Sequence, residues 1–188
     1  VTPTNGNFET NDALVLKSDA NGTGRIMTIQ PTAGVTGEVE VQRFVEAGIT
    51  GWRMQTSAVK NQTLSNWTDD FTTAGFPGSD YPSFSFVSIR TYDETIGGSK
   101  DHPLSWEAPI DISDPIDETQ GFWIWSGNGL PATAAFTIDN KGEINQGDIA
   151  MDLDFTSDLG AADDGWNLFG NPYPAPIDFD SPNWTKTN

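Results

Sequence analysis

The sequence predicts an all-β domain, an antiparallel β-sandwich or jelly-roll-like fold with at most one short helix. Short runs of alternating polar and apolar residues recur along the chain, and turn signals built on Gly, Asn and Pro separate them. A single stretch shows helical spacing of apolar residues. A chain of 188 residues is long enough for one such domain.

Several runs predict individual strands. Residues 37–44 alternate, with valines on one face and polar residues on the other. Residues 51–55 predict a strand with Trp52 and Met54 toward the core. Further strands are expected at residues 13–17, 25–30, 84–90 and 121–126.

The alternation is longest in residues 147–155, where every second residue is apolar. This pattern predicts a strand that pairs with residues 133–139 in a hairpin, with the turn at residues 140–142. The helical stretch is residues 61–71, and two aspartates near its end oppose the helix dipole. We therefore expect that helix to be short.

The domain organisation is expected to be simple. Residues 1–35 are either the end of a preceding stalk or the first strands, and residues 36–188 form the β-sandwich module. Within the module, Gly165–Asp180 is rich in proline and reads as a rigid joint between two sheets. Strands are expected on both sides of this joint, at residues 166–169 and 177–179, with Trp166 and Phe169 in or near the core.

Composition excludes several classes of partner. Twenty-seven acidic and nine basic residues give a formal charge of −18, which argues against nucleic acid and anionic membranes as partners. No apolar run approaches the length of a membrane span. Cysteine is absent, so neither disulfides nor thiol chemistry are expected.

Catalysis is not expected either. Nucleophilic catalysis needs a base beside the nucleophile, and the one histidine, His102, precedes a proline in a long loop. The GxSxG pattern of hydrolases is absent. Paired carboxylates cleave glycosides in some enzymes, but carboxylates this abundant carry little information about a site.

Calcium is a candidate ligand, since loops rich in Asp and Asn supply the oxygen atoms it prefers. Two clusters qualify. Their residues are Asp111, Asp114, Asp117 and Glu118 in the first, and Asp158, Asp163 and Asp164 in the second. Neither matches the regular EF-hand spacing, and a solvated acidic loop explains each cluster as well.

Aromatic residues suggest a carbohydrate site. Trp123 and Trp125 share one face of a strand about 7 Å apart, a spacing that suits stacking on sugar rings. The candidate residues are Trp106, Trp123, Trp125 and Tyr173. The alternative is that this strand is buried on both faces, because Phe122 and Ile124 between the tryptophans are apolar too.

Several stretches, in order, resemble the β-rich regions of large surface proteins that Bacteroidota export through the type IX secretion system. The matching segments are LVLKSDANGTGRI, GWRMQTSAV, NQTLSNWTDDF, YDET, QGFWIWSG, INQGDIAMDLDF and GWNLFGNPYPAPIDFDSPNWTKTN, of which GNPYP is the most specific. This resemblance implies a non-catalytic part of an adhesin or of a secreted enzyme. It also implies further strands after residue 188, so the expectation is that the chain is cut there, is part of a longer polypeptide, or receives the missing strands from another chain. In the last case an open sheet edge would serve as an assembly surface.

We therefore expect a non-catalytic, extracellular or cell-surface module with a structural or adhesive role, with Ca²⁺ as a candidate stabilising ion. Its partners would be other surface domains or glycans, with neither nucleic acid binding nor membrane insertion. One alternative is a carbohydrate-binding module of a protein that acts on polysaccharides. Another is a subunit of an extracellular filament that assembles by strand exchange through the open edge.

Overall fold

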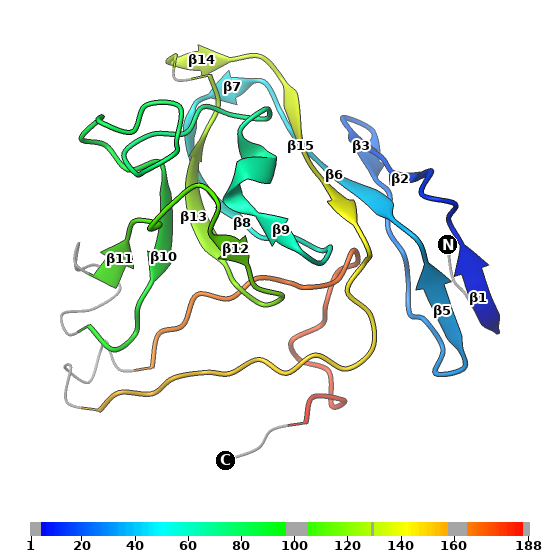
Figure 1. Cartoon of the computed structure of the whole chain (residues 1–188). Coiled ribbons are helices and arrows are strands. Elements are labelled where there is room, and N and C mark those ends of the chain that lie inside the picture. The colour runs from blue at the N-terminus through cyan, green and yellow to red at the C-terminus, as the bar shows by residue number, and fades with distance from the viewer. Residues whose placement is uncertain (1–4, 97–104, 129, 158–164, 186–188) are drawn as a thin grey trace.

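The computed structural model describes residues 5–96, 105–128, 130–157 and 165–185, and its fold is all-β, as the sequence predicts (Figure 1). The described residues contain one short 3-10 helix, η1 (Leu64–Trp67), inside the stretch predicted to be helical. The strands are β1 (Gly6–Glu9), β2 (Leu14–Leu16), β3 (Ser18–Asp19), β4 (Gly22–Thr23), β5 (Ala33–Thr36), β6 (Val39–Val45), β7 (Gly48–Ile49), β8 (Gly51–Gln55), β9 (Gln62–Thr63), β10 (Ile89–Tyr92), β11 (Trp106–Glu107), β12 (Pro115–Ile116), β13 (Phe122–Ser126), β14 (Ala132–Thr133) and β15 (Phe136–Gly142).

The largest sheet has four antiparallel strands in the order β11-β10-β13-β8. Successive side chains of a strand point to opposite faces, and β13 follows this rule with Phe122 and Ile124 buried. These two side chains belong to a core cluster with Leu64 and Trp67 of η1 and with Ile138 of β15. The inner face of the sheet is therefore closed by η1 and β15.

A second sheet has the order β15-β6-β2, with β15 antiparallel and β2 parallel to β6. Val39 and Val41 of β6 are buried, as the alternation of residues 37–44 predicts. They lie in a second core cluster that includes residues from before position 36. Its buried members are Leu16, Ile26, Val35, Val39, Val41, Ala58, Val59 and Ile144.

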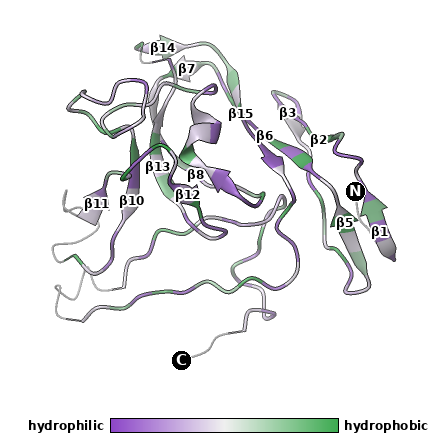
Figure 2. Cartoon of the chain, in the orientation of Figure 1, coloured by the Kyte–Doolittle hydropathy of each residue, from purple (hydrophilic) through white to green (hydrophobic). Residues whose placement is uncertain are grey.

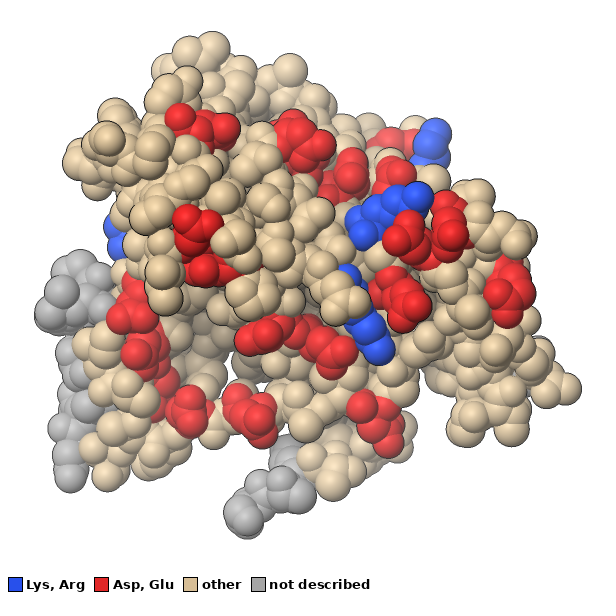
Figure 3. All heavy atoms as spheres, viewed as in Figure 1, with Lys and Arg blue, Asp and Glu red and all other residues tan. Residues whose placement is uncertain are grey.

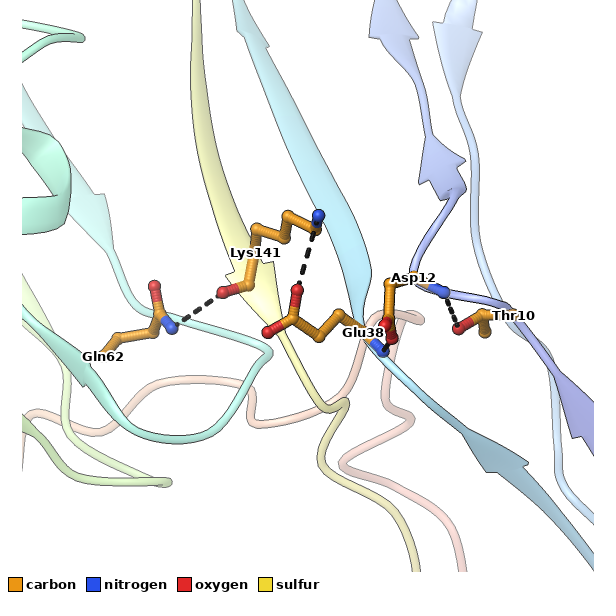
Figure 4. A network of polar contacts seen from close by, with 5 residues as sticks. All are labelled: Thr10, Asp12, Glu38, Gln62 and Lys141. Carbon is orange, nitrogen blue, oxygen red and sulfur yellow. Dashed lines mark hydrogen bonds and ion pairs between the residues drawn. The ribbon is translucent and has the colours of Figure 1, made fainter.

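Polar contacts also tie the N-terminal segment to the second sheet (Figure 4). The ammonium of Lys141 on β15 lies 3.4 Å from a carboxylate oxygen of Glu38, and the backbone N–H of Glu38 donates to Asp12 at 2.7 Å. Asp12 in turn donates its own backbone N–H to the hydroxyl of Thr10. On the other side, Gln62 donates to the backbone carbonyl of Lys141 at 3.1 Å, so the network runs from β9 to the N-terminal strands.

The predicted hairpin of residues 133–139 and 147–155 is wrong. Residues 140–142 do not turn, because β15 stays paired with β6 until Gly142 lies opposite Val39. Residues 147–157 are extended but belong to no sheet, and they run as a single ribbon beneath the four-stranded sheet (Figure 1). Apolar and polar residues still follow one another along this ribbon (Figure 2).

The faces of β8 are also opposite to the prediction. Trp52 lies opposite Trp125 and Met54 opposite Trp123, so both side chains share the outer face with these tryptophans. Arg53 takes the inner side instead, and its guanidinium donates to the backbone carbonyl of Ser126 at 3.0 Å. This polar pairing lets a charged residue occupy the side that the prediction gave to apolar ones.

Other predicted strands differ in extent or do not form. Residues 25–30, 166–169 and 177–179 form no strand, and β10 begins only at Ile89. An isolated bridge joins Phe169 to Gln120, and Phe169 is half-buried. Trp166 is 48% exposed, contrary to the prediction that it lies in or near the core. None of the helices in the described part of the chain is long and apolar enough to cross a membrane.

Candidate functional site

The outer face of the four-stranded sheet carries a continuous row of aromatic side chains, which we call the aromatic strip. Its residues are Tyr92, Trp106, Trp123, Trp52, Trp125 and Phe86, in order of contact. All six are half-buried. Because Phe122 and Ile124 fill the inner face of β13, Trp123 and Trp125 are left on the outer one.

The rings of the strip pack on one another at different angles. Trp52 stacks on Trp123 with ring centroids 4.4 Å apart and planes 28° apart. Trp106 lies 4.7 Å from Trp123 at 45°, and Trp125 meets Trp52 edge-on at 76°. These arrangements are favourable for aromatic pairs. The strip is therefore a packed ridge of rings, not a flat platform.

One end of the strip opens into a pocket of about 370 Å³, which we call the aromatic groove. Its lining residues are Met54, Tyr92, Trp106, Trp123, Trp166, Asn167 and Leu168. Trp166 and Met54 are 48% and 62% exposed, so a ligand in the groove can reach both side chains. Trp166 comes from the Gly165–Asp180 stretch, which thus supplies one wall of the groove.

A second pocket of about 460 Å³ adjoins the groove and shares Tyr92, Asn167 and Leu168 with it. We call it the acidic pocket. Its carboxylate residues are Asp93, Glu94, Glu107, Asp117, Asp152 and Asp154. None of the described residues that line it is Lys, Arg or His. Acidic side chains also outnumber basic ones on the face of the molecule shown in Figure 3.

Glu94, two residues after β10, is hydrogen-bonded to the two extended segments that contain Thr156 and Gly165. This side chain is only 4% exposed, and its carboxylate accepts hydrogen bonds from the hydroxyl and backbone N–H of Thr156, at 2.7 and 2.8 Å. It accepts a third from the backbone N–H of Gly165 at 2.8 Å. These bonds, first of all that of the Thr156 hydroxyl, lower the pKa of Glu94, so the carboxylate is ionised at neutral pH.

Asn167 joins the two extended segments below the sheet. Its side-chain amide donates to the backbone carbonyl of Asp154 at 2.8 Å and accepts the backbone N–H of Asp154 at 3.0 Å. The same amide donates to the carbonyl of Gly165. The side chain of Asn167 thus bonds both the N–H and the carbonyl of Asp154, the two groups with which a neighbouring strand would pair.

Three of the four predicted carbohydrate-binding residues lie together. Trp106, Trp123 and Trp125 belong to the aromatic strip, and they are half-buried instead of buried. Tyr173 lies elsewhere and lines a separate pocket with residues such as Pro174. Its hydroxyl donates to the backbone carbonyl of Gly147 at 2.7 Å, so it holds two loops together.

Two carboxylates of the first predicted calcium cluster accept hydrogen bonds within their own loop. The carboxylate of Asp111 accepts hydrogen bonds from the hydroxyl and the backbone N–H of Ser113, and these bonds, that of the hydroxyl most, lower the pKa of Asp111. The carboxylate of Asp114 accepts the backbone N–H of Ile110 at 2.7 Å. The structure does not bring Asp111, Asp114, Asp117 and Glu118 together: no group of three or more acidic or histidine side chains among the described residues can hold a metal ion. Asp158, Asp163, Asp164 and His102 lie outside the described residues.

The sequence did not single out Trp52, Phe86, Tyr92, Met54 or Trp166 as site residues. Trp52 and Met54 reach the outer face through the register of β8 with β13, and Tyr92 through the pairing of β10 with β11. A signal was present, since both β8 and β13 carry large apolar residues at alternate positions. The side that these residues take depends on long-range pairing.

No family model matches the chain, and no curated protein or solved structure is significantly similar to it. The chemistry of the site therefore rests on its own residues. The groove and the acidic pocket offer aromatic faces, carboxylates, hydroxyls and amides. Such groups can contact both the apolar and the polar parts of a ligand.

Proposed function

We propose that this chain is a non-catalytic, adhesive module of an exported cell-surface protein and that it binds carbohydrate through the aromatic groove. The observation that carries the proposal is the groove itself, where the rings of Trp106, Trp123 and Trp166 surround a pocket on the outer face of a sheet. Export to the cell surface rests on the resemblance of GNPYP and its neighbouring segments to type IX-secreted proteins.

Sugar rings suit this lining for a physical reason. The C–H groups on one face of a pyranose ring form an apolar surface that packs on an aromatic ring, and its hydroxyl groups need polar partners at the rim. Asn167 lies at the boundary of the groove, and Thr119 and Gln120 line the adjoining pocket. Amides, hydroxyls and carboxylates can all accept hydrogen bonds from sugar hydroxyl groups.

The test measures binding of soluble polysaccharides to the wild-type protein and to Trp166→Ala by affinity electrophoresis and calorimetry. Trp166 is exposed, so its truncation should leave the fold intact, and the affinity should fall at least tenfold because an aromatic anchor is lost. The matched control is Tyr81→Ala, which removes an aromatic ring of similar exposure outside the groove. Equal binding by wild type and Trp166→Ala, or binding of no polysaccharide at all, would contradict the proposal.

A second candidate function, self-assembly by strand exchange, is favoured by residues 147–157. Their alternation predicts a strand, yet they belong to no sheet, and Leu153 and Phe155 are 60% and 73% exposed. An incoming strand that pairs with residues 149–153, and so avoids the backbone of Asp154 that Asn167 already bonds, could cover such side chains. Sedimentation over a range of protein concentrations tests this candidate, at raised ionic strength to screen the charge of −18. Oligomers that Phe155→Asp dissolves would support it, and monomers throughout would exclude it.

A further inference from the structure

We infer that the aromatic groove takes a glycan that carries free amino groups, a chain of de-N-acetylated amino sugars whose ammonium groups enter the acidic pocket. This inference rests on the proposed function, because it names the class of carbohydrate that the same site binds. Its basis is the continuity of the two pockets, which share Tyr92, Asn167 and Leu168. A ligand that fills the groove is therefore already in contact with the wall of the acidic pocket.

Charge selects the ligand. Six carboxylates line the acidic pocket, and its described lining contains no basic side chain to balance them. Between described residues, the one ion pair found joins Lys141 to Glu38 on the second sheet, away from these carboxylates. The negative potential of these carboxylates attracts a cationic ligand to the pocket. Sulfated glycans and those with uronic acids would meet the same charges unfavourably.

The arrangement favours a ligand with several separated positive charges, in preference to a single metal ion. The carboxylates of the acidic pocket come from four segments of the chain, namely residues 93–94, 107, 117 and 152–154. No group of three or more acidic or histidine side chains in the described ranges converges closely enough to hold a metal ion. Ammonium groups repeated along a chain, by contrast, can each meet a different carboxylate.

A sugar fits better than a basic peptide for two reasons. A peptide bound as an added strand needs open backbone groups, but at Asp154 both the N–H and the carbonyl are already bonded to Asn167. In addition, each amino-sugar unit offers an apolar ring face and an ammonium group side by side. This pairing matches a groove lined by tryptophans beside a pocket lined by carboxylates, and an ammonium near Trp106 or Trp166 also gains from the aromatic quadrupole.

The experiment compares three soluble oligosaccharides of equal length and linkage, built from glucosamine, from N-acetylglucosamine or from glucose. Affinities are measured by calorimetry at low ionic strength and at a pH below the pKa of the sugar amine. The glucosamine oligomer should bind at least tenfold more tightly than the two neutral ones. That preference should shrink when salt is added or when the pH is raised above the pKa of the amine.

Two double variants locate the charge effect. Glu107→Gln/Asp152→Asn removes two exposed carboxylates of the acidic pocket and should lower the affinity for the glucosamine oligomer by roughly three- to tenfold. The same variant should leave the affinity for the neutral oligomers unchanged. The matched control, Glu46→Gln/Glu143→Gln, changes the net charge equally at exposed positions outside both pockets and should have no effect.

The outcomes separate the inference from the proposed function. Equal binding of all three oligomers, each weakened by Trp166→Ala, would keep carbohydrate binding and overturn the inference. Binding of none of them would overturn this inference, and binding of no polysaccharide of any kind would overturn the proposed function too. An equal loss in the control variant would show attraction by overall charge and not by the acidic pocket. A lysine oligomer that binds more tightly than the glucosamine oligomer, insensitive to Trp166→Ala, would also overturn the inference.

Discussion

The indole N–H of Trp67 donates a hydrogen bond to the side-chain carbonyl of Asn140 at 3.1 Å, and both residues are buried. Trp67 belongs to η1 and Asn140 to β15, so this bond joins the helix to the second sheet inside the larger core cluster. The indole also meets the ring of Phe122 edge-on at 5.4 Å. One side chain thus contacts both sheets that enclose the core.

Trp67→Phe should lower the free energy of unfolding by about 2–4 kcal/mol. The phenyl ring leaves part of the indole volume empty, and the carbonyl of Asn140 loses its partner in a buried place. Urea denaturation followed by circular dichroism measures the loss. The double variant Trp67→Phe/Asn140→Leu removes the orphaned amide and should recover part of the stability. A double variant no more stable than Trp67→Phe would show that the hydrogen bond contributes little.

Asp70 should make the protein less stable as the pH rises. Burial raises the pKa of Asp70 from 3.8 to about 7, although the N–H of Asp139 donates to its carboxylate at 3.0 Å. The folded state therefore holds a proton that the unfolded chain releases at lower pH. The stability that this bound proton contributes to the folded state is present in full below pH 3.8 and is lost as the pH rises to about 7.

Asp70→Asn removes this titration and keeps an acceptor for the N–H of Asp139. We expect it to raise the free energy of unfolding by about 1–2 kcal/mol at alkaline pH, a figure reduced for the partial exposure of the group. At pH 4 the change should be small. Thermal unfolding at both pH values measures the difference, with the exposed Asp152→Asn as the matched control, since Asp152 does not contribute to the pKa of Asp70. A variant that is equally stabilised at both pH values would contradict this assignment.

The alternation of polar and apolar residues predicted which segments are extended, but it did not predict which segments pair with one another. Residues 37–44 and 121–126 correspond to β6 and β13, because each strand has neighbours on both sides and two buried apolar residues on one face. Residues 147–155 show the same pattern, but the side-chain amide of Asn167 takes the backbone of Asp154 and no sheet forms there. A period of two reports the direction of side chains and contains no information on which strand lies alongside.

For the aromatic strip, too, the sequence predicted which side chains share a face but not which face that is. Trp123 and Trp125 were expected to share a face, and they do so because that follows from strand geometry alone. Whether that face was the inner or the outer one could not be read from β13, since Phe122 and Ile124 are apolar as well. The choice is made by η1, which covers the side of Phe122, and by Trp52, which stacks on Trp123 from β8.

Glu94→Ala should loosen the wall that the two extended segments form. Three hydrogen bonds from Thr156 and Gly165 end on this carboxylate, and alanine supplies none of them. We expect faster cleavage within residues 147–157 in limited proteolysis and a red-shifted emission from Trp166. Glu94→Gln is the matched control, since its amide oxygen can still accept both backbone N–H groups. Equal cleavage of Glu94→Ala and wild type would show that the wall is held by other contacts.

The charge of Glu94 adds a dependence on pH with the opposite sign to that of Asp70. Its pKa is lowered in the folded protein, so its contribution to stability is present above the ordinary pKa of a glutamate and is lost as the pH falls through the lowered value. The proteolysis of residues 147–157 in the wild type should therefore accelerate in acid. In Glu94→Gln, which does not titrate, it should accelerate less.

Gly170→Ala should destabilise the protein by about 1–3 kcal/mol. Gly170 begins the GNPYP segment, and a Cβ atom there would overlap the side chain of Thr56, whose hydroxyl donates to the carbonyl of Gln120 at 2.7 Å. The backbone N–H of Gly170 also donates to Thr119 at 2.8 Å, so the segment cannot move away without losing that bond. Gly48→Ala is the matched control: Gly48 is exposed, and an added Cβ would meet nothing within 4 Å. Urea denaturation should separate the two variants, because only the first forces the chain against the end of β8. If both unfold at the wild-type midpoint, the close approach of Gly170 to Thr56 does not hold the Gly165–Asp180 stretch against the sheet.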